Sequence, residues 1–298
     1  MSEPEGRSRI FAEGALDGVC ALITGGGTGL GRESAFELAR CGAQVTIAGR
    51  RVEVLEDALE RAREDLGETA AARIGFVSGD VREPEGAERL VAAALERHER
   101  LDVLVNNAGG QFFSPAELIA TKGWRAVWRL NVGGMLNMSE AARRLAFAPS
   151  GTGTVINVTL SPHHGMPGMA HSGAARATVE ALTKELAARW ADSNIAMIAV
   201  AAGHFATEVT AKYPESVRAG ASRTVPIQRL GEPIEHAWLI ALLCSPLGRL
   251  FTGSTVTLDG ARDNWFGPWP PPGLADETGE VPVEERGGAQ RATGPGLR

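Results

Sequence analysis

A glycine-rich turn near the amino terminus constrains the fold more than any other feature of the chain. Residues 24–31 read TGGGTGLG, follow a short apolar run and lead into an amphipathic helical pattern. Glycines allow positive φ angles and close approach to the backbone, and the first turn of a helix presents unpaired N–H groups to an anion. The turn therefore predicts a diphosphate site in a strand–turn–helix unit. The residues predicted to form it are Thr24, Gly25, Gly27, Thr28, Gly29, Leu30 and Gly31.

Short apolar runs alternate with helical patterns along the rest of the chain. The runs are continuous rather than alternating, which is typical of parallel strands buried on both faces. We predict strands at Cys20–Thr24, Val45–Ala48, Gly75–Ser78, Val103–Asn106, Val155–Val158, Ile195–Ala201 and Thr255–Leu258. We predict helices at Arg32–Arg40, Val52–Leu66, Glu85–His98, Thr121–Leu145, Gly173–Ala191 and Pro233–Cys244. Right-handed crossovers between such strands give an α/β fold, a doubly wound, mostly parallel seven-stranded sheet of the Rossmann type with helices on both faces.

The domain boundaries are expected where this alternation of strands and helices ends. Residues 15–266 are expected to form one domain, interrupted at 204–230 by a long polar insertion that we interpret as a lid. Residues 1–14 lack periodicity and are expected to form a flexible arm. The proline- and glycine-rich tail at 267–298 is expected to be partly disordered, although the aromatic residues Trp265, Phe266 and Trp269 near its start could dock on the domain.

Composition excludes several classes of partner. A net charge of −6 argues against a nucleic acid or an anionic membrane surface. No apolar run reaches 18 residues, so no membrane span is predicted. The three cysteines, Cys20, Cys41 and Cys244, lie far apart without CxxC spacing, which favours reduced thiols in a cytoplasmic protein.

The end of the second predicted strand indicates which dinucleotide would bind. An NAD site usually places an acidic residue there for the ribose 2′-hydroxyl, whereas this chain has Arg50 and Arg51. A guanidinium suits a 2′-phosphate in charge and in bidentate geometry. The sequence thus favours NADP(H) over NAD(H), with two solvated arginines at a helix start as the alternative.

Further motifs resemble the short-chain dehydrogenase/reductase family over residues 15–262. The glycine turn matches the cofactor turn of that family, and NNAG at 106–109 resembles its fourth-strand motif. The resemblance implies cofactor contacts at Asp80, Val81, Asn107, Ala108, Gly109, Gly203 and Thr207, with Ala202 where the family has proline before that glycine. It implies a catalytic role for the helical Asn131. It also implies a homo-oligomer, either a tetramer or a dimer.

A closer resemblance concerns three segments. GQFFSPAE at 110–117, KGW at 122–124 and HSGAARA at 171–177 resemble the peroxisomal trans-2-enoyl-CoA reductases, which are similar to the 2,4-dienoyl-CoA reductases. Both reduce C=C bonds conjugated to a CoA thioester with NADPH. The resemblance implies the same small-molecule substrate class, an acyl-CoA, for this chain.

The chain departs from the family at the catalytic residues. The usual Tyr-x-x-x-Lys pair aligns with His171 and Ala175, and the only tyrosine of the chain is Tyr213 in the predicted lid. His171 could act as the acid or could only shape the pocket, and Arg176 is expected on the helix surface or at an interface. Thr159 or Ser161 could replace the family serine. Histidines at 163, 164, 171 and 204 lack metal-ligand spacing, so no metal site is predicted.

Three functions remain open at this point. Reduction of a C=C bond tolerates the loss of tyrosine better than ketone reduction does, because no alkoxide has to be protonated as it forms. A carbonyl reductase or alcohol dehydrogenase using His171 is the second, and a catalytically silent dinucleotide-binding protein is the third. In the predicted lid, four cations could steer CoA phosphates and four apolar or aromatic residues could line an acyl slot, or the segment could simply be solvated. These residues are Lys212, Arg218, Arg223 and Arg229, and Val209, Tyr213, Val217 and Val225.

Overall fold

One parallel sheet organises the part of the chain that the structure describes. The computed structural model describes residues 6–161, 168–208, 210 and 225–263. Its seven strands lie in the order β3-β2-β1-β4-β5-β6-β7, and every paired neighbour is parallel. The predicted fold class is therefore confirmed. The strands are β1 (Cys20–Thr24), β2 (Gln44–Gly49), β3 (Ile74–Ser78), β4 (Val103–Asn106), β5 (Gly153–Leu160), β6 (Ile195–Ala202) and β7 (Thr255–Leu258).

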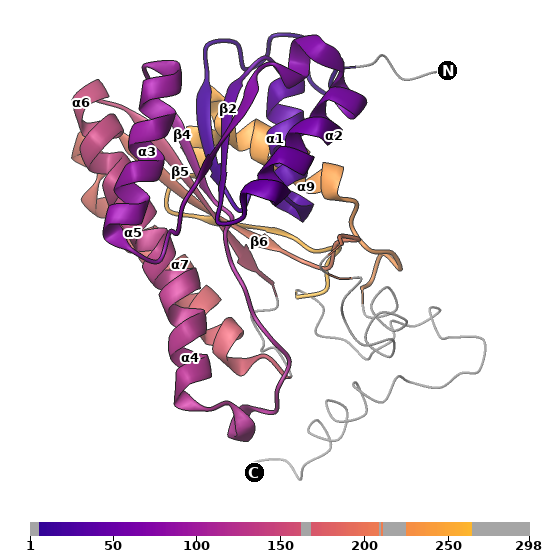
Figure 1. The fold of residues 1–298 in the computed structure, drawn as a ribbon. Helices are drawn as coiled ribbons and strands as arrows, with labels where there is room; N and C mark the ends of the chain where they lie inside the picture. The colour runs from indigo at the N-terminus through magenta and orange to yellow at the C-terminus, as the bar shows by residue number, and fades with distance from the viewer. Residues whose placement is uncertain (1–5, 162–167, 209, 211–224, 264–298) are drawn as a thin grey trace.

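Two helical layers cover the sheet (Figure 1). On one face lie α1 (Gly29–Arg40), α2 (Val52–Ala71) and α9 (Pro233–Cys244), which share a core built around Phe36, Leu55 and Ile240. On the other face lie α3 (Pro84–His98), α5 (Gly134–Ala142) and α7 (Ala170–Arg189), which pack around Leu90, Met138 and Phe147. Because both faces are covered, β5 and β6 are buried along nearly their whole length, which explains the continuous apolar sequence of β6.

The helical run predicted at Thr121–Leu145 is longer and less regular than expected. It begins as α4 (Thr121–Trp128), passes through a π-helical segment at Arg129–Gly133 into α5, and continues through a second π-helical segment at Arg143–Phe147 into α6 (Ala148–Ser150). π-helical segments inside α-helices are frequent at functional sites. The first of them contains Asn131.

The described part of the amino-terminal arm packs on the domain. The Ser8 hydroxyl donates a hydrogen bond to the buried carboxylate of Glu37 on α1, and Phe11 lies against the core of the same face. Within residues 6–14, the segment expected to be flexible thus makes contacts with the domain. None of the helices in the described ranges is both long and apolar enough to cross a membrane.

Candidate active site

A large cleft opens at the carboxyl ends of the strands, where parallel sheets place their ligand sites. Its volume is about 1140 Å³, more than the 300–1,000 Å³ usual for a single small ligand. Its lining runs from Arg50 and Arg51 after β2, past the glycine turn, to Thr159 and Ser161 at the end of β5. The cleft is therefore long enough to receive a dinucleotide and a second molecule beside it.

The glycine turn forms one wall of this cleft. Gly25 and Gly29 have φ angles of +66° and +53°, which favour glycine. A Cβ atom on Gly31 would lie 2.4 Å from Asn107 Nδ2 and 2.5 Å from the Gly25 carbonyl oxygen. Gly31, the last glycine of the turn, thus permits the close packing of α1 against the strand ends. The turn residues Gly25, Gly27, Thr28, Gly29 and Leu30 line the cleft.

Thr24 and Asn107 hold the turn in place. The Thr24 hydroxyl accepts hydrogen bonds from the backbone N–H groups of Asn107, at 3.1 Å, and Ala108, at 3.0 Å. The Asn107 side chain donates to the carbonyl oxygens of Thr24, at 3.0 Å, and Gly25, at 3.2 Å. These bonds tie the end of β1 to the end of β4. The Thr24 side chain is therefore a support of the cofactor wall, whereas Asn107, Ala108 and Gly109 also line the cleft.

The ends of β2 and β3 carry charged groups that line the cleft beyond the glycine turn. Arg50, Arg51, Asp80 and Val81 all line the cleft. Asp80 accepts hydrogen bonds from the Arg82 guanidinium, including one from Nε at 2.9 Å, and these bonds lower the pKa of Asp80 to about 2. The Asp80 carboxylate is therefore ionised at neutral pH, and its charge is already matched by Arg82.

Thr159 and Ser161 both reach the cleft at the end of β5, and each is engaged with a carboxylate. The Thr159 hydroxyl donates to Glu180 Oε1 at 2.8 Å, and the Ser161 hydroxyl donates to Asp259 Oδ2 at 2.8 Å. A hydroxyl that donates its proton to a carboxylate still has lone pairs to accept a bond. Both Thr159 and Ser161 therefore remain candidates for the counterpart of the family serine.

The structure does not bring His171 into the cleft. Its side chain is fully buried between aromatic rings, with the Phe112 ring centroid 4.3 Å away and the Trp124 centroid 6.0 Å away. Neither ring nitrogen has a hydrogen-bond partner within the described ranges of the chain. The other predicted catalytic residue of the helices, Asn131, lies beside the cleft instead.

Asn131 fastens the loop after β4 to the π-helical segment. Its Nδ2 donates to the Gly110 carbonyl oxygen at 2.9 Å and to that of Val127 at 2.8 Å, while its Oδ1 accepts from the Gly110 N–H at 3.2 Å. The side chain therefore positions the backbone of the cofactor wall. A small cavity of about 10 Å³ next to it has room for about one water molecule.

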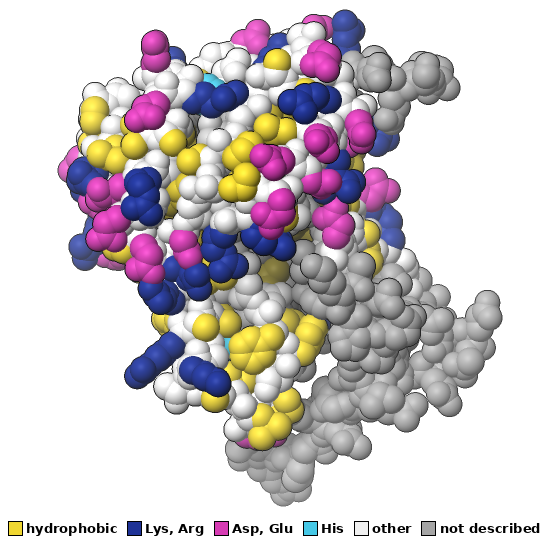
Figure 2. All heavy atoms as spheres, in the orientation of Figure 1, with side chains coloured by type: hydrophobic (Ala, Val, Ile, Leu, Met, Phe, Trp, Pro, Cys, Tyr) yellow, Lys and Arg dark blue, Asp and Glu magenta, His cyan; other side chains and the backbone are white. Residues whose placement is uncertain are grey.

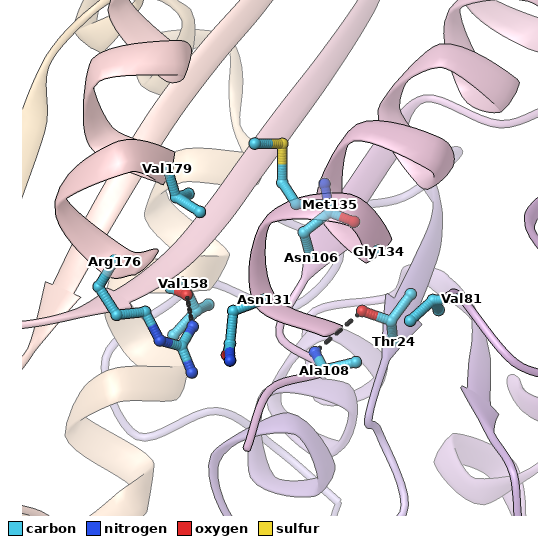
Figure 3. A pocket seen from close by; sticks show the side chains of 10 residues that line it. All are labelled: Thr24, Val81, Asn106, Ala108, Asn131, Gly134, Met135, Val158, Arg176 and Val179. Carbon is cyan, nitrogen blue, oxygen red and sulfur yellow. Dashed lines mark hydrogen bonds between the residues drawn. The ribbon is translucent and has the colours of Figure 1, made fainter. Parts of the chain in front are cut away.

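Arg176 is the α7 side chain that reaches the cleft, contrary to the expected surface or interface position, and with Val179 it also lines the small cavity (Figure 3). Its Nη1 donates to the Val158 carbonyl oxygen at 2.7 Å, and the residue lines both the cleft and the small cavity. A Cβ atom on Gly109 would lie 2.2 Å from Arg176 Nη2, so the glycine makes room for the guanidinium. The alignment of the family pair with His171 and Ala175, one residue earlier on the helix, left this role of Arg176 unpredicted.

The register of α7 explains the difference. Ala175 is fully buried in an apolar cluster with Val127, Val132 and Val179. A step of one residue turns the side chain by about 100° around the helix, from that cluster to the cleft. One helical turn before Arg176 stands Ser172, whose hydroxyl donates to Gln111 Oε1 at 2.9 Å. Arg176, and not Ala175, is thus the α7 side chain that lines the cleft, and the buried Ser172 precedes it at the Tyr-x-x-x-Lys spacing.

The remaining predicted residues divide between the cleft and the parts that are not described. Gly203 and Thr207 line the cleft, together with His204 and Arg262. Several residues with predicted roles lie outside the described part of the chain. They are His163, His164, Val209, Lys212, Tyr213, Val217, Arg218, Arg223 and the tail from residue 264. No group of three or more histidine, cysteine, aspartate or glutamate residues with metal-binding geometry occurs in the described ranges.

The buried His236 and the partly buried His204 should make the protein less stable in mild acid. Burial lowers the pKa of His204 to about 4, with a smaller contribution from Arg262, and burial alone lowers that of His236 to about 4. Between pH 6.5 and pH 4 the unfolded chain takes up these protons and the folded chain does not. As the pH falls through that window, each histidine should therefore lower the free energy of unfolding by about 1.4 kcal/mol per pH unit.

Urea unfolding at pH 7, 6 and 5 checks this expectation. The His204→Asn variant should reduce the slope of unfolding free energy against pH, and His236→Gln should reduce it independently. A slope that neither buried-site variant changes would contradict the assignment.

Comparison with known proteins identifies the family. A family model described as enoyl-(acyl carrier protein) reductase matches residues 25–261. A probable 2,4-dienoyl-CoA reductase of Bacillus subtilis is 34% identical over 84% of this chain and 97% of the relative, and a galactitol 2-dehydrogenase of Cereibacter sphaeroides is 35% identical over 84% and 97%. The solved structure of a citronellol catabolism dehydrogenase of Pseudomonas aeruginosa superposes with a TM-score of 0.74 at 35% identity, covering 85% of this chain and 98% of the other. The structure of a short-chain dehydrogenase of Bacillus anthracis superposes with a TM-score of 0.73 at 33% identity, covering 83% of this chain and 98% of the other. This chain therefore belongs to the short-chain dehydrogenase/reductase family.

Proposed function

We propose that this protein is an NADP(H)-dependent reductase of the C=C bond in an enoyl-CoA thioester. Family membership implies a nicotinamide dinucleotide cofactor. The glycine turn, with its positive φ angles and close helix packing, fits the diphosphate of such a cofactor. Relatives named 2,4-dienoyl-CoA reductases are 34% identical over most of the chain, which supports the substrate class.

The observation that carries the proposal is the guanidinium of Arg176 at the cleft. Bound NADPH would supply the hydride that adds to the β-carbon of the enoyl group. Negative charge then develops on the thioester oxygen, and a fixed cation with several N–H donors stabilises that charge. A guanidinium does not release a proton at neutral pH, so Arg176 cannot replace a tyrosine that protonates an alkoxide. The α-carbon would instead take its proton from water.

An apolar surface beside the cleft suits an acyl chain. Phe113, Leu130, Leu160 and Met169 line the same end of the cleft as Arg176. Figure 2 shows hydrophobic side chains gathered over the part of this face where Figure 1 places α4 and the segment before it. Phe112, Phe113 and Leu118 are the exposed hydrophobic residues of that segment. An acyl group could bury part of this surface.

One assay separates the candidate functions. NADPH oxidation at 340 nm is followed with a trans-2-enoyl-CoA, a dienoyl-CoA and a panel of ketones. We expect oxidation with the thioesters. Oxidation with ketones alone would support the carbonyl reductase, for which the galactitol dehydrogenase relative is the argument. NADPH binding without oxidation of any substrate would support a silent dinucleotide-binding protein.

The preference for NADP(H) gives a direct prediction. Replacing Arg50 and Arg51 together by alanine should raise the Kd for NADPH by about 10- to 100-fold, because charge-assisted bonds to the 2′-phosphate contribute about 1.5–3 kcal/mol. The Kd for NADH should stay within about threefold, since it has no 2′-phosphate. Calorimetric titration measures both. Arg61→Gln, an exposed α2 arginine paired with Asp57, is the control. Equal losses for both nucleotides would contradict the prediction.

We also propose a compartment and an oligomeric state for the protein. The three cysteines are buried free thiols, which suits a reducing compartment such as the cytoplasm. A homo-oligomer, tetramer or dimer, is proposed from family membership. Light scattering of the purified protein tests the oligomer directly.

A further inference from the structure

A carboxylate from a distant part of the chain binds at the first turn of α1. Glu208, which lies 179 positions further along the chain, accepts a hydrogen bond from the Gly29 N–H at 3.2 Å through Oε2. Its Oε1 lies 2.7 Å from Arg32 Nη2 in an ion pair. The α1 sequence has no acidic residue in its first turn, and Thr28 makes no side-chain cap there. The carboxylate of Glu208 therefore supplies the negative charge that a helix start favours.

This carboxylate stands where the cofactor diphosphate would bind. Thr28, Gly29 and Leu30, whose backbone surrounds the contact, line the cleft. The neighbouring Thr207 also lines it, and a Cβ atom on Gly29 would lie 3.7 Å from the Thr207 side chain. A diphosphate at a helix amino terminus uses the same N–H donors that Glu208 now engages. Both anions cannot hold the Gly29 N–H at once.

We propose that Glu208 is an internal competitor of the cofactor. Its carboxylate occupies the diphosphate subsite and must leave it when a dinucleotide binds. The inference rests on the proposed dinucleotide binding but not on the substrate or on the choice between NADPH and NADH. The carboxylate weakens every ligand that carries the diphosphate and leaves ligands without that group unaffected. Its side chain is 49% exposed, so solvent screens the pair and limits the effect to about three- to tenfold in Kd.

The test compares three ligands on matched variants. Glu208→Gln removes the charge while keeping the size, and Glu208→Ala removes the hydrogen bond as well. Glu185→Gln, which loses an exposed ion pair with Arg189 on α7, controls for one negative charge fewer. The ligands are NADPH and ADP, which contain the diphosphate, and 2′-AMP, which does not. Calorimetric titration gives each Kd, and thermal unfolding without ligand confirms that each variant is folded.

The proposal expects Kd values for NADPH and ADP about three- to tenfold lower in both Glu208 variants, with 2′-AMP within twofold of the parent protein. Unchanged Kd values for NADPH and ADP would overturn it. An equal gain for 2′-AMP, or the same gain in Glu185→Gln, would also overturn it, because a general charge effect would then suffice. Failure of the proposed function is visible separately, as a parent protein that binds NADPH without oxidising it in the presence of enoyl-CoA.

Discussion

Replacing Arg176 by alanine should lower kcat/KM for an enoyl-CoA by about 10²- to 10³-fold, the usual loss when one preorganised donor to a developing oxyanion is removed. The guanidinium is held at the end of β5 by its bond to the Val158 carbonyl oxygen. It therefore needs no rearrangement when charge forms on the thioester oxygen. Most of the loss should appear in kcat, because the charge exists only in the transition state.

Two further variants make this expectation specific. Arg176→Lys keeps the charge but loses the planar fork, and it should recover part of kcat. Arg189→Ala, which removes an exposed arginine further along the same helix, should leave kcat unchanged. Steady-state kinetics with saturating NADPH, together with separate NADPH titrations, distinguishes loss of chemistry from loss of cofactor. A kcat/KM within threefold of the parent value in Arg176→Ala would remove the residue from the mechanism.

The sequence predicts the strands and the cofactor wall well because both depend on local patterns. Short apolar runs between helical patterns leave few alternatives to a strand, and β1, β4 and β7 have the predicted bounds. The glycine turn is recognisable for the same reason, since its backbone angles require glycine. Local patterns do not reveal, however, that Thr24 and Asn107 bond to one another's backbone across 83 positions.

The catalytic side of the cleft is harder to predict because it depends on register and on distant contacts. His171 and Ala175 have the same four-residue spacing as Ser172 and Arg176, and only the packing of Ala175 against Val179 and its neighbours selects between them. The π-helical segment around Asn131 has no sequence signature that would have revealed it. The contact of Glu208 with Gly29 joins two segments that the chain order keeps apart.

The glycine turn itself provides the most severe expected loss of binding. Gly31→Ala would place a Cβ atom 2.4 Å from Asn107 Nδ2 and 2.5 Å from the Gly25 carbonyl oxygen, too close for either atom to remain in place. Asn107 cannot move without losing its bonds to Thr24 and Gly25, so the turn must shift away from the end of β4. We expect the Kd for NADPH to rise by about 100-fold or more, since each N–H donor of the turn is displaced. We also expect the free energy of unfolding to fall by about 1–3 kcal/mol, as for other overpacked sites.

Gly133→Ala is the matched control for this substitution. Gly133 has helical backbone angles, and the nearest atom to its added Cβ lies 3.9 Å away, so alanine fits without displacement. Because alanine favours a helix over glycine by about 1 kcal/mol, Gly133→Ala should be as stable as the parent protein or more stable. Calorimetry with NADPH and urea unfolding measure the two effects on both variants. If Gly31→Ala bound NADPH as tightly as Gly133→Ala, the diphosphate could not depend on the geometry of this turn, and the placement of the cofactor along the cleft would have to be abandoned.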